Sequence, residues 1–244
     1  MNQPDFIELP GCEPIPILHE DRSVIAVDKP RGWMLVPVSW QRTGRNLQAA
    51  INSSIAARDF WARSRGLKFL RYVHRLDADT SGILLFAKSL GAVQTYSDLF
   101  ESRQMEKLYL AVVAGRRKES EWTCRLKLAP DPKRTGRMKV DNRNGKSAET
   151  HFQAVSEMSG LTLIECRPIT GRTHQIRVHF KHFGHPVVCD KLYAKGKPCL
   201  LGFSRQALHA FSLAIDLPSG ERRTFEAPLP GDFVAAQSHF LGEG

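Results

Sequence analysis

Short apolar runs that stand in pairs around turn residues constrain the fold of this chain most. Residues 24–27 and 83–87 are continuous apolar runs with the length of buried strands. Paired runs joined by short polar turns predict antiparallel hairpins. The predicted strands lie over 17–29 with a turn at 20–22, over 108–114, over 152–155 and 161–166 with a turn at 158–160, and over 208–217 and 224–227 with a turn at 218–220.

Three helices are predicted between these strands, each from a capping residue and an apolar face. Thr43 and Ser89 each precede apolar residues at helical spacing, and Thr173 precedes a third face that reaches Phe183 and stops at Gly184. Regular alternation of strands and helices is missing, which argues against a doubly wound parallel sheet. The sequence therefore predicts an α+β fold with a mostly antiparallel mixed sheet flanked by helices.

Several features of the sequence favour a cytoplasmic protein. The longest stretch without Asp, Glu, Lys or Arg is 46–57, twelve residues, whereas a membrane-spanning helix needs about 18 or more apolar residues. The first twenty residues hold four acidic residues and no Lys or Arg, whereas targeting peptides are basic. The five cysteines form no C-x-x-C pair, so we expect free thiols in a reducing compartment. They are Cys12, Cys124, Cys166, Cys189 and Cys199.

Positive charge is concentrated in one segment. The formal net charge is +10, and residues 115–146 hold eleven basic side chains against four acidic ones. Such a basic segment indicates a polyanion as partner, with a solvated charge-rich loop as the alternative. Lys133, Arg134, Arg137 and Lys139 lie among prolines and a glycine, which predicts an exposed loop.

The densest polar stretch is 72–82, directly before the predicted strand at 83–87. Loops at strand ends often hold catalytic groups because a rigid scaffold positions them. Asp77 and Asp79 are two residues apart, and paired carboxylates are the machinery of glycoside hydrolases. Asp79 also begins a run of turn-forming residues. These residues by themselves leave both interpretations open.

A second polar stretch, 168–179, places Thr-Gly-Arg before a predicted helix start. Since helix N-termini favour anions, Arg172 and Arg177 suit a carboxylate or phosphates. A capped surface helix with basic residues is the alternative. The histidines at 174, 179, 182 and 185 lack the spacing of a zinc site, and no glycine motif for nucleotides is present. We therefore expect neither a metal nor a nucleotide cofactor.

Four motifs, in chain order, resemble those of RluA-type pseudouridine synthases. His-Arg-Leu-Asp-x-x-Thr-Ser-Gly at 74–82 resembles the family signature, and Thr-Gly-Arg-Thr-His-Gln-Ile-Arg-Val-His at 170–179 resembles a later motif that continues to Asp190-x-Leu-Tyr. Asp-Lys-Pro-x-Gly at 28–32 and Lys-x-Tyr-x-Ala at 107–111 resemble the two others. The match runs from about residue 15 to residue 228 and so covers most of the chain.

The resemblance implies an RNA pseudouridine synthase. It implies one catalytic domain over 15–244 with a central RNA-binding cleft, after an N-terminal extension over 1–14. Many family members begin with an S4-type RNA-binding domain, but only about fourteen residues precede the match here, so RNA binding is expected from the catalytic domain. We expect a monomer that uses no cofactor and acts on tRNA or rRNA. A non-catalytic RNA-binding protein on the same fold is the alternative.

The resemblance also assigns roles to individual residues. It makes Asp77 the catalytic carboxylate and leaves Asp79 as a turn residue. Arg177 is expected to keep Asp77 ionised and oriented by a bidentate pair. In addition, Arg75 is expected to fill the gap that the flipped base leaves in the RNA stack. Tyr109 and Ile176 are expected to contact the two faces of that base. Lys29 and Arg172 are expected to contact phosphates or to support the active-site loop. Attack on C1′, attack on the uracil and removal of the 2′ proton all remain open for Asp77, with the glycal route favoured.

Overall fold

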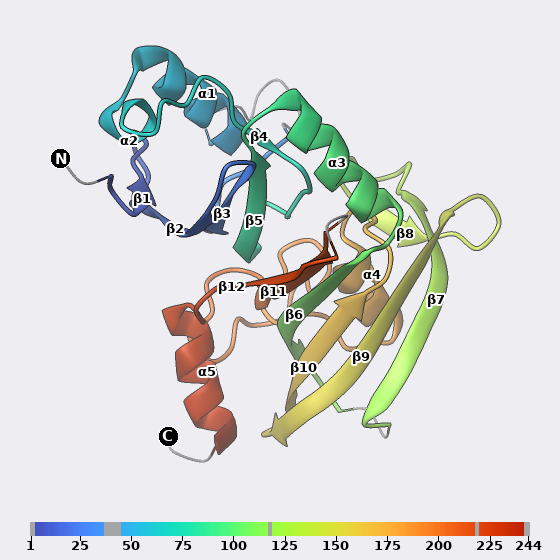
Figure 1. Cartoon of the computed structure of the whole chain (residues 1–244). Coiled ribbons are helices and arrows are strands. Elements are labelled where there is room, and N and C mark those ends of the chain that lie inside the picture. Colours follow the sequence, from blue (N-terminus) through green and yellow to red (C-terminus); the bar gives the residue numbers. More distant parts are fainter. Residues whose placement is uncertain (1–2, 37–44, 117–118, 218–219, 242–244) are drawn as a thin grey trace. The chain divides into compact units, whose positions relative to one another are not determined.

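The computed structural model describes residues 3–36, 45–116, 119–217 and 220–241. The chain forms two compact units. Unit 1 comprises Met1–Met105 and Ser212–Pro228, and unit 2 comprises Glu106–Phe211 and Leu229–Gly244. Within each unit the strands pair antiparallel and helices accompany them (Figure 1), so the predicted α+β class is confirmed. The assignment of 15–244 to a single domain stays a prediction.

Unit 1 is built on β1 (Phe6–Ile7), β2 (Ile15–Glu20), β3 (Val24–Lys29), β4 (Arg71–Tyr72), β5 (Ser81–Ala87), the second half of β11 (Leu208–Asp216) and β12 (Arg222–Glu226). β1, β2, β3 and β5 pair in that order, β4 pairs with β5, and β11 pairs with β12. The predicted turn between β2 and β3 forms because Asp21 Oδ1 accepts hydrogen bonds from Ser23 N and Val24 N. β1 brings part of the expected N-terminal extension into this unit.

The helices of unit 1 are α1 (Leu47–Ala57), α2 (Phe60–Arg63) and α3 (Leu90–Glu101). Ser89 caps α3 as predicted, since its side chain accepts a hydrogen bond from Ala92 N. α1 is capped by Asn46, whose side chain accepts from Ala49 N, so the prediction of Thr43 as the cap is wrong. Thr43 itself lies outside the described residues.

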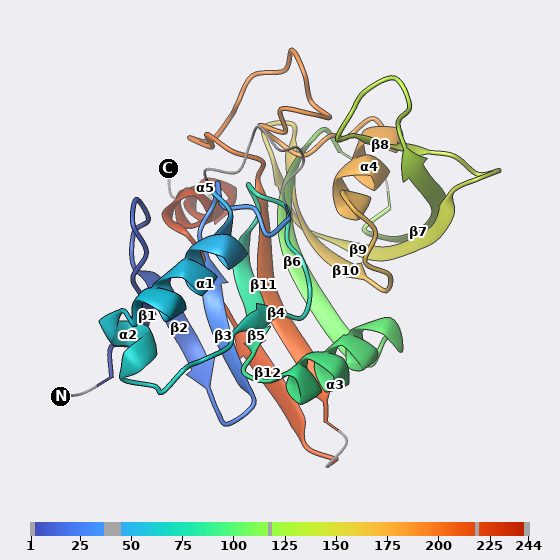
Figure 2. The same ribbon diagram turned by 90° about the horizontal axis from the view of Figure 1, so that it is seen from above.

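Unit 2 contains β6 (Met105–Ala114), β7 (Glu121–Pro130), β8 (Met138–Val140), β9 (Lys146–Met158), β10 (Leu161–Pro168), α4 (Gln175–His182) and α5 (Gly231–Leu241). Its strands pair in the order β6, β10, β9, β7, β8. The predicted turn between β9 and β10 is present at Ser159 and Gly160, both with positive φ. The sheet is curved, and α4 lies on its concave side, next to β7 and β8 (Figure 2).

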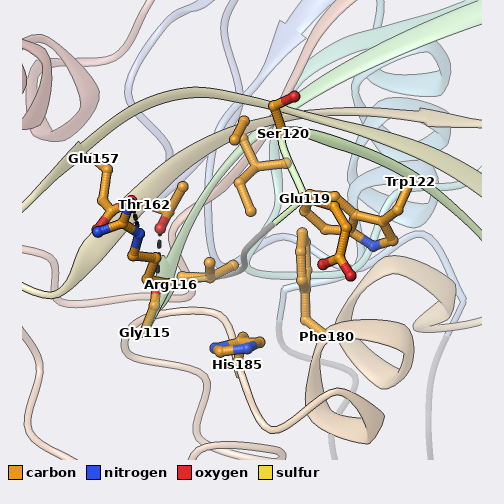
Figure 3. Close-up of a pocket in the computed structure, with 12 residues that line it drawn as sticks. Gly115, Arg116, Glu119, Ser120, Trp122, Glu157, Thr162, Phe180 and His185 are labelled. Carbon is orange, nitrogen blue, oxygen red and sulfur yellow. Dashed lines mark hydrogen bonds and ion pairs between the residues drawn. The ribbon is translucent and has the colours of Figure 1, made fainter.

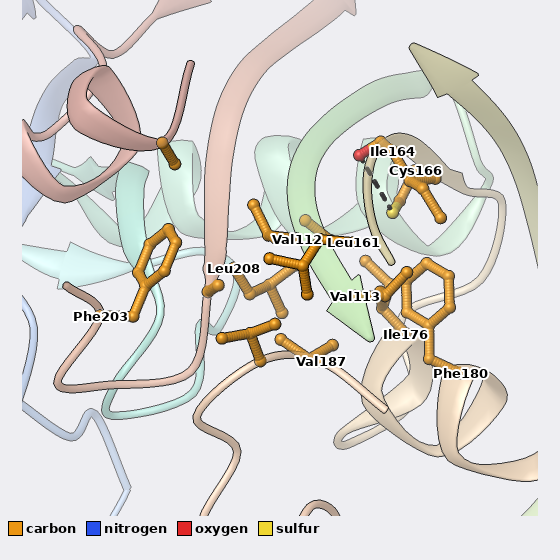
Figure 4. Packing of buried hydrophobic residues seen from close by; sticks show 14 of the residues in the cluster. Val112, Val113, Leu161, Ile164, Cys166, Ile176, Phe180, Val187, Phe203 and Leu208 are labelled. Atoms are coloured by element: carbon orange, nitrogen blue, oxygen red, sulfur yellow. Dashed lines mark hydrogen bonds between the residues drawn. The ribbon is translucent and has the colours of Figure 1, made fainter. Parts of the chain in front are cut away.

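The core of unit 2 joins the sheet to both helices. Phe180 of α4 packs with Val113, Ile164 and Cys166 (Figure 4), and α5 adds its buried Phe233 to the same cluster. Burial of such side chains contributes roughly 1.5–3 kcal/mol each. This packing fixes the height and rotation of α4, and with them the directions in which its polar side chains point.

The start of α4 differs from the predicted one. The N-cap is His174, in the left-handed conformation with φ 55°, and not Thr173. His174 makes no side-chain capping hydrogen bond, and Gln175 Oε1 instead accepts a hydrogen bond of 2.9 Å from Arg172 N, which ties the preceding loop to the helix start. The predicted end is confirmed, with Gly184 at φ 82° just after the helix. Among the described residues, none of the helices has the length and hydropathy that a membrane span requires.

Two of the cysteines correct the prediction of free thiols. Cys189 and Cys199 form a disulfide, whereas Cys12, Cys124 and Cys166 are free. The intervening loop folds back so that the two Cα atoms lie 4.5 Å apart, which is within bridging distance. The spacing in the sequence carried no sign of this, because loop conformation decides whether two cysteines meet.

Candidate active site

Asp77 lies in the loop between β4 and β5, and a buried lysine holds this loop. The Lys29 side chain is 0% exposed, and its Nζ donates hydrogen bonds of 2.9 Å to the carbonyl oxygens of Pro30, Ala78 and Thr80. A buried ammonium group needs such acceptors, because an unpaired buried charge is strongly unfavourable. Lys29 therefore supports the Asp77 loop as predicted, and the alternative prediction of a phosphate contact is wrong.

His74 anchors the other end of the same loop. Its Nε2 accepts a hydrogen bond of 3.1 Å from Leu85 N in β5, and its ring stacks on Phe100 at a centroid distance of 4.6 Å. The turn after Asp77 closes with a hydrogen bond of 3.1 Å from Thr80 N to the Asp77 carbonyl oxygen. The backbone on both sides of Asp77 is thus fixed, while the residue itself is only half-buried.

Arg75 and Asp79 lie on either side of Asp77 in this loop. Arg75 is exposed, which is the placement that insertion into an RNA stack requires. Asp79 lies in the turn with Ala78, in agreement with its reading as a turn residue. The expected role of Arg75 stays a prediction.

Tyr109, Ile176 and Arg177 belong to unit 2. Tyr109 lies in β6 opposite Cys166 of β10 and packs against the core cluster that contains Ile176. Ile176 and Arg177 form the first turn of α4 and are 6% and 4% exposed. The fold thus brings Tyr109 and Ile176 to one cluster. Their contacts with the target base and the pair between Asp77 and Arg177 stay predictions.

Arg177 has a partner that the sequence reasoning missed. Its Nε and Nη2 donate to Oδ2 and Oδ1 of Asp190 at 2.7 and 2.9 Å, and the Asp190 side chain is 0% exposed. Asp190 Oδ1 also accepts hydrogen bonds from Leu192 N and Tyr193 N. This bidentate pair fixes the orientation of the guanidinium plane. The Asp190-x-Leu-Tyr motif was the signal that could have pointed to this partner.

Gln175 and Arg172 tie the start of α4 to β9. Gln175 Nε2 donates to Glu149 O and Thr150 Oγ1 at 2.8 and 2.9 Å, and Arg172 Nε donates to Ser147 O at 3.0 Å. Arg172 is otherwise exposed, which fits a phosphate contact. The loop that carries it is held in place by backbone hydrogen-bond partners.

The basic segment 115–146 contains a hairpin of β7 and β8 with connecting residues 131–137. Arg137 departs from the prediction of an exposed loop. It is half-buried, and its guanidinium carbon lies 5.0 Å from the centroid of the Tyr193 ring. The expectation is therefore wrong for Arg137, because an aromatic ring covers it, and confirmed for Lys133 and Arg134. Lys139 is exposed but lies in the strand β8 and not in a loop. The exposed ones are Lys133, Arg134 and Lys139.

The histidines of α4 and the following loop do not converge. His174 Nδ1 lies 2.9 Å from Tyr193 Oη, and His185 Nδ1 lies 3.1 Å from Ala114 O. His179 is 0% exposed, and neither of its ring nitrogens has a hydrogen-bond partner in the described part of the chain. No group of three His, Cys, Asp or Glu that could hold a metal occurs in the described ranges.

We expect the buried His179 to make the stability of the protein depend on pH. Burial lowers its pKa from 6.5 to about 4, with a smaller effect of His182. The unfolded chain binds a proton at this residue below pH 6.5 while the folded chain does not, so stability falls as the pH drops from 6.5 to 4. We expect a loss of up to about 3 kcal/mol in the free energy of unfolding from this group. Urea unfolding at a series of pH values measures it.

The matched variants are His179→Leu and His182→Gln. The first removes the buried imidazole, so its stability should vary less with pH in this range. The second removes an exposed histidine and should keep most of the dependence of the wild type, because burial is the larger cause of the lowered pKa of His179. Equal pH dependence in wild type and His179→Leu would contradict the assignment.

A cavity of about 180 Å³ lies in unit 2 between β6, β9, β10 and α4 and holds none of the predicted site residues (Figure 3). Arg116 Nε pairs with Glu157 at its rim, and Thr162 Oγ1 donates to Gly115 O. The neighbouring Arg117 and Lys118 lie outside the described residues. The lining of the cavity also includes Glu119, Ser120, Trp122, Phe180 and His185.

Comparisons with known proteins agree with the motifs. An uncharacterized RNA pseudouridine synthase of Bacillus subtilis is 37% identical over 219 residues, which are 89% of this chain and 70% of that protein. The ribosomal large subunit pseudouridine synthase D of Nitrosomonas europaea is 35% identical over 229 residues, 91% of this chain and 64% of that protein. The chain thus spans about two thirds of the length of these relatives.

Solved structures support the fold. The structure of human RNA Pseudouridylate Synthase Domain Containing 4 matches with a TM-score of 0.73 at 24% identity, covering 93% of this chain and 92% of that one. The family model described as RNA pseudouridylate synthase matches residues 23–182, which include the Asp77 loop, Tyr109 and the first turn of α4. On this match and on its relatives, the chain belongs to the RNA pseudouridylate synthase family.

Proposed function

We propose that this protein isomerises uridine in structured RNA to pseudouridine, with Asp77 as the catalytic carboxylate. The observation that carries the proposal is the construction of the Asp77 loop. Lys29 and His74 fix the backbone on both sides of the half-buried Asp77 carboxylate. The Lys29 side chain is fully buried in this role. Rigid support of this kind is what a catalytic group needs and what simple RNA binding does not.

The reaction breaks the bond from N1 of uracil to C1′ and forms the bond from C5 to C1′, with no net loss of atoms or electrons. In the route we favour, ionised Asp77 removes the proton at C2′ as uracil leaves, and returns it after C5 has bonded to C1′. Tyr109 stacks on the turning base, Ile176 limits its movement, and Arg177 holds negative charge at Asp77. The proton on C5 moves to N1, which completes the isomerisation.

The target uridine has to leave its stack before it can react. Flipping costs a few kcal/mol, and the exposed Arg75 suits the vacated space because a guanidinium can stack and donate hydrogen bonds together. The relatives named as ribosomal large subunit synthases favour ribosomal RNA as the substrate, with tRNA as the second class. A monomeric enzyme without a cofactor completes the proposal. Its cytoplasmic location is proposed without the argument from free thiols, because Cys189 and Cys199 form a disulfide.

The deciding experiment maps pseudouridines in total RNA from cells with and without the gene, followed by turnover of the purified protein on the RNA that changes. We expect one or a few sites to disappear and to be restored by wild type but not by Asp77→Asn. Binding of the same RNA without any turnover would instead identify a non-catalytic RNA-binding protein.

The exposed basic residues of the β7–β8 hairpin are expected to contact RNA phosphates. Replacing Lys133, Arg134 and Lys139 with Gln should weaken binding and flatten its salt dependence. Each lost contact reduces the slope of log K against log salt by roughly 0.7 on single strands and 0.9 on duplex. Affinities measured at several salt concentrations give this slope.

A variant with the same loss of charge elsewhere provides the control. Arg63, Lys68 and Arg71 are exposed on unit 1, and their replacement with Gln should leave more of the salt slope in place. A hairpin variant with the full wild-type slope and an intact fold would show that the hairpin is only a solvated charged surface.

A further inference from the structure

Tyr193 joins three parts of unit 2. It is 3% exposed, and its Oη accepts a hydrogen bond of 2.8 Å from Met138 N in β8. The same oxygen lies 2.9 Å from Nδ1 of His174, the residue directly before α4. Its backbone N donates to Asp190 Oδ1 at 3.0 Å. One buried side chain thus connects the basic hairpin, the start of α4 and the loop that carries the partner of Arg177.

Two guanidinium groups lie over the Tyr193 ring. The central carbons of Arg137 and Arg177 are 5.0 and 5.1 Å from its centroid. A cation over a desolvated aromatic ring gains roughly 2 kcal/mol. Arg177 is neutralised by Asp190, whereas Arg137 has a buried Nε without a hydrogen-bond partner among the described residues. The position of the Arg137 side chain therefore depends on the Tyr193 ring. The position of the ring depends in turn on the hairpin, through the hydrogen bond from Met138 N to Tyr193 Oη.

We propose that Tyr193 is a positioning residue that couples the position of the basic hairpin to the orientation of Arg177. This rests on the proposed function, in which Arg177 serves Asp77 and the hairpin contacts RNA. When RNA phosphates hold the hairpin, Met138 and Arg137 hold the tyrosine in place. The tyrosine, together with Asp190, then keeps the guanidinium of Arg177 and the first turn of α4 in the orientation that the structure shows.

The surroundings of Tyr193 suit such a coupling because the loop that carries it is held at several points. The disulfide between Cys189 and Cys199 joins the two ends of the loop that carries Tyr193. Asp190 Oδ1 holds the same loop through the N–H groups of Leu192 and Tyr193. A displacement of β8 is therefore passed to α4 rather than absorbed by the loop.

A double-mutant cycle tests the coupling. Tyr193→Phe keeps the ring and removes the hydroxyl, and Arg137→Met keeps the length of the side chain and removes the charge. We expect each to lower the single-turnover rate at saturating RNA about tenfold, and the double variant to fall no further, because both changes break the same connection. A hundredfold loss in the double variant, or changes confined to affinity, would overturn the proposal.

The cycle needs a matched control and a safeguard against misfolding. Lys133→Gln changes an exposed residue of the same hairpin, so its effect should simply add to that of Tyr193→Phe. His174→Asn disconnects the hydroxyl from α4 and tolerates the left-handed backbone, so it should reproduce the rate loss of Tyr193→Phe without touching the core. Loss of rate only in proportion to loss of thermal stability, across all variants, would mean a merely structural role.

A second readout does not require turnover. A short uridine-containing stem-loop RNA should slow amide hydrogen exchange in wild type both in residues 131–140 and at the start of α4. In Tyr193→Phe the protection should remain in the hairpin and be lost at α4. Protection of the hairpin alone in both proteins would overturn the coupling. A wild type that shows this pattern without turnover would reject the proposed function and keep the inference.

Discussion

Asp77→Asn is expected to reduce turnover by at least about a thousandfold while RNA affinity stays within about tenfold. The amide keeps the shape of the carboxylate and loses both its charge and its capacity to take a proton. Phosphate contacts elsewhere on the protein supply most of the affinity, so binding survives. Single-turnover conversion and RNA binding, measured on the same preparation, separate the two effects.

Asp79→Asn is the matched control for this variant. Asp79 lies two residues further along, in the turn with Ala78, and Asn is equally compatible with a turn. We expect its activity to stay within about threefold of wild type, because a turn residue does not touch the reacting atoms. Turnover by a homogeneous Asp77→Asn protein would remove Asp77 from its central role.

Asp190→Asn is expected to cause the largest loss of stability, about 3–5 kcal/mol, because it leaves a buried guanidinium without the carboxylate that neutralises it. For a chain of this size that corresponds to a fall of roughly 10 °C or more in the melting temperature. Turnover should fall as well, since Asp190 fixes the plane of Arg177. Thermal unfolding followed by circular dichroism, together with turnover below the melting temperature, measures both effects.

An exposed ion pair provides the comparison. Asp216 pairs with Arg222 at 3.0 Å, but its side chain is 60% exposed. Asp216→Asn should therefore change the free energy of unfolding by no more than about 0.5 kcal/mol, because solvent screens the pair. If Asp190→Asn were as stable as Asp216→Asn, the buried pair would contribute little to holding α4.

Local sequence determined the strands and the loop that carries Asp77. The apolar runs that became β3 and β5 are predictable because a buried strand needs nothing but consecutive apolar residues of the right length. The turn at Asp21 and the cap at Ser89 follow from hydrogen bonds within three residues. Motif order was sufficient to predict the family, which the match over residues 23–182 shows, while the roles of Asp77, Tyr109 and Arg177 stay predictions.

Tertiary structure decided what these residues contact. Lys29 became buried because its carbonyl acceptors at Ala78 and Thr80 lie 49 and 51 residues further along the chain. Arg177 acquired Asp190, 13 residues away, and Arg137 was covered by the Tyr193 ring, a contact that strand pairing and the fold of the 190s loop create. The disulfide likewise depends on that loop. Contacts of this kind leave no periodic signal in a sequence, because they form only when separate elements pack against one another.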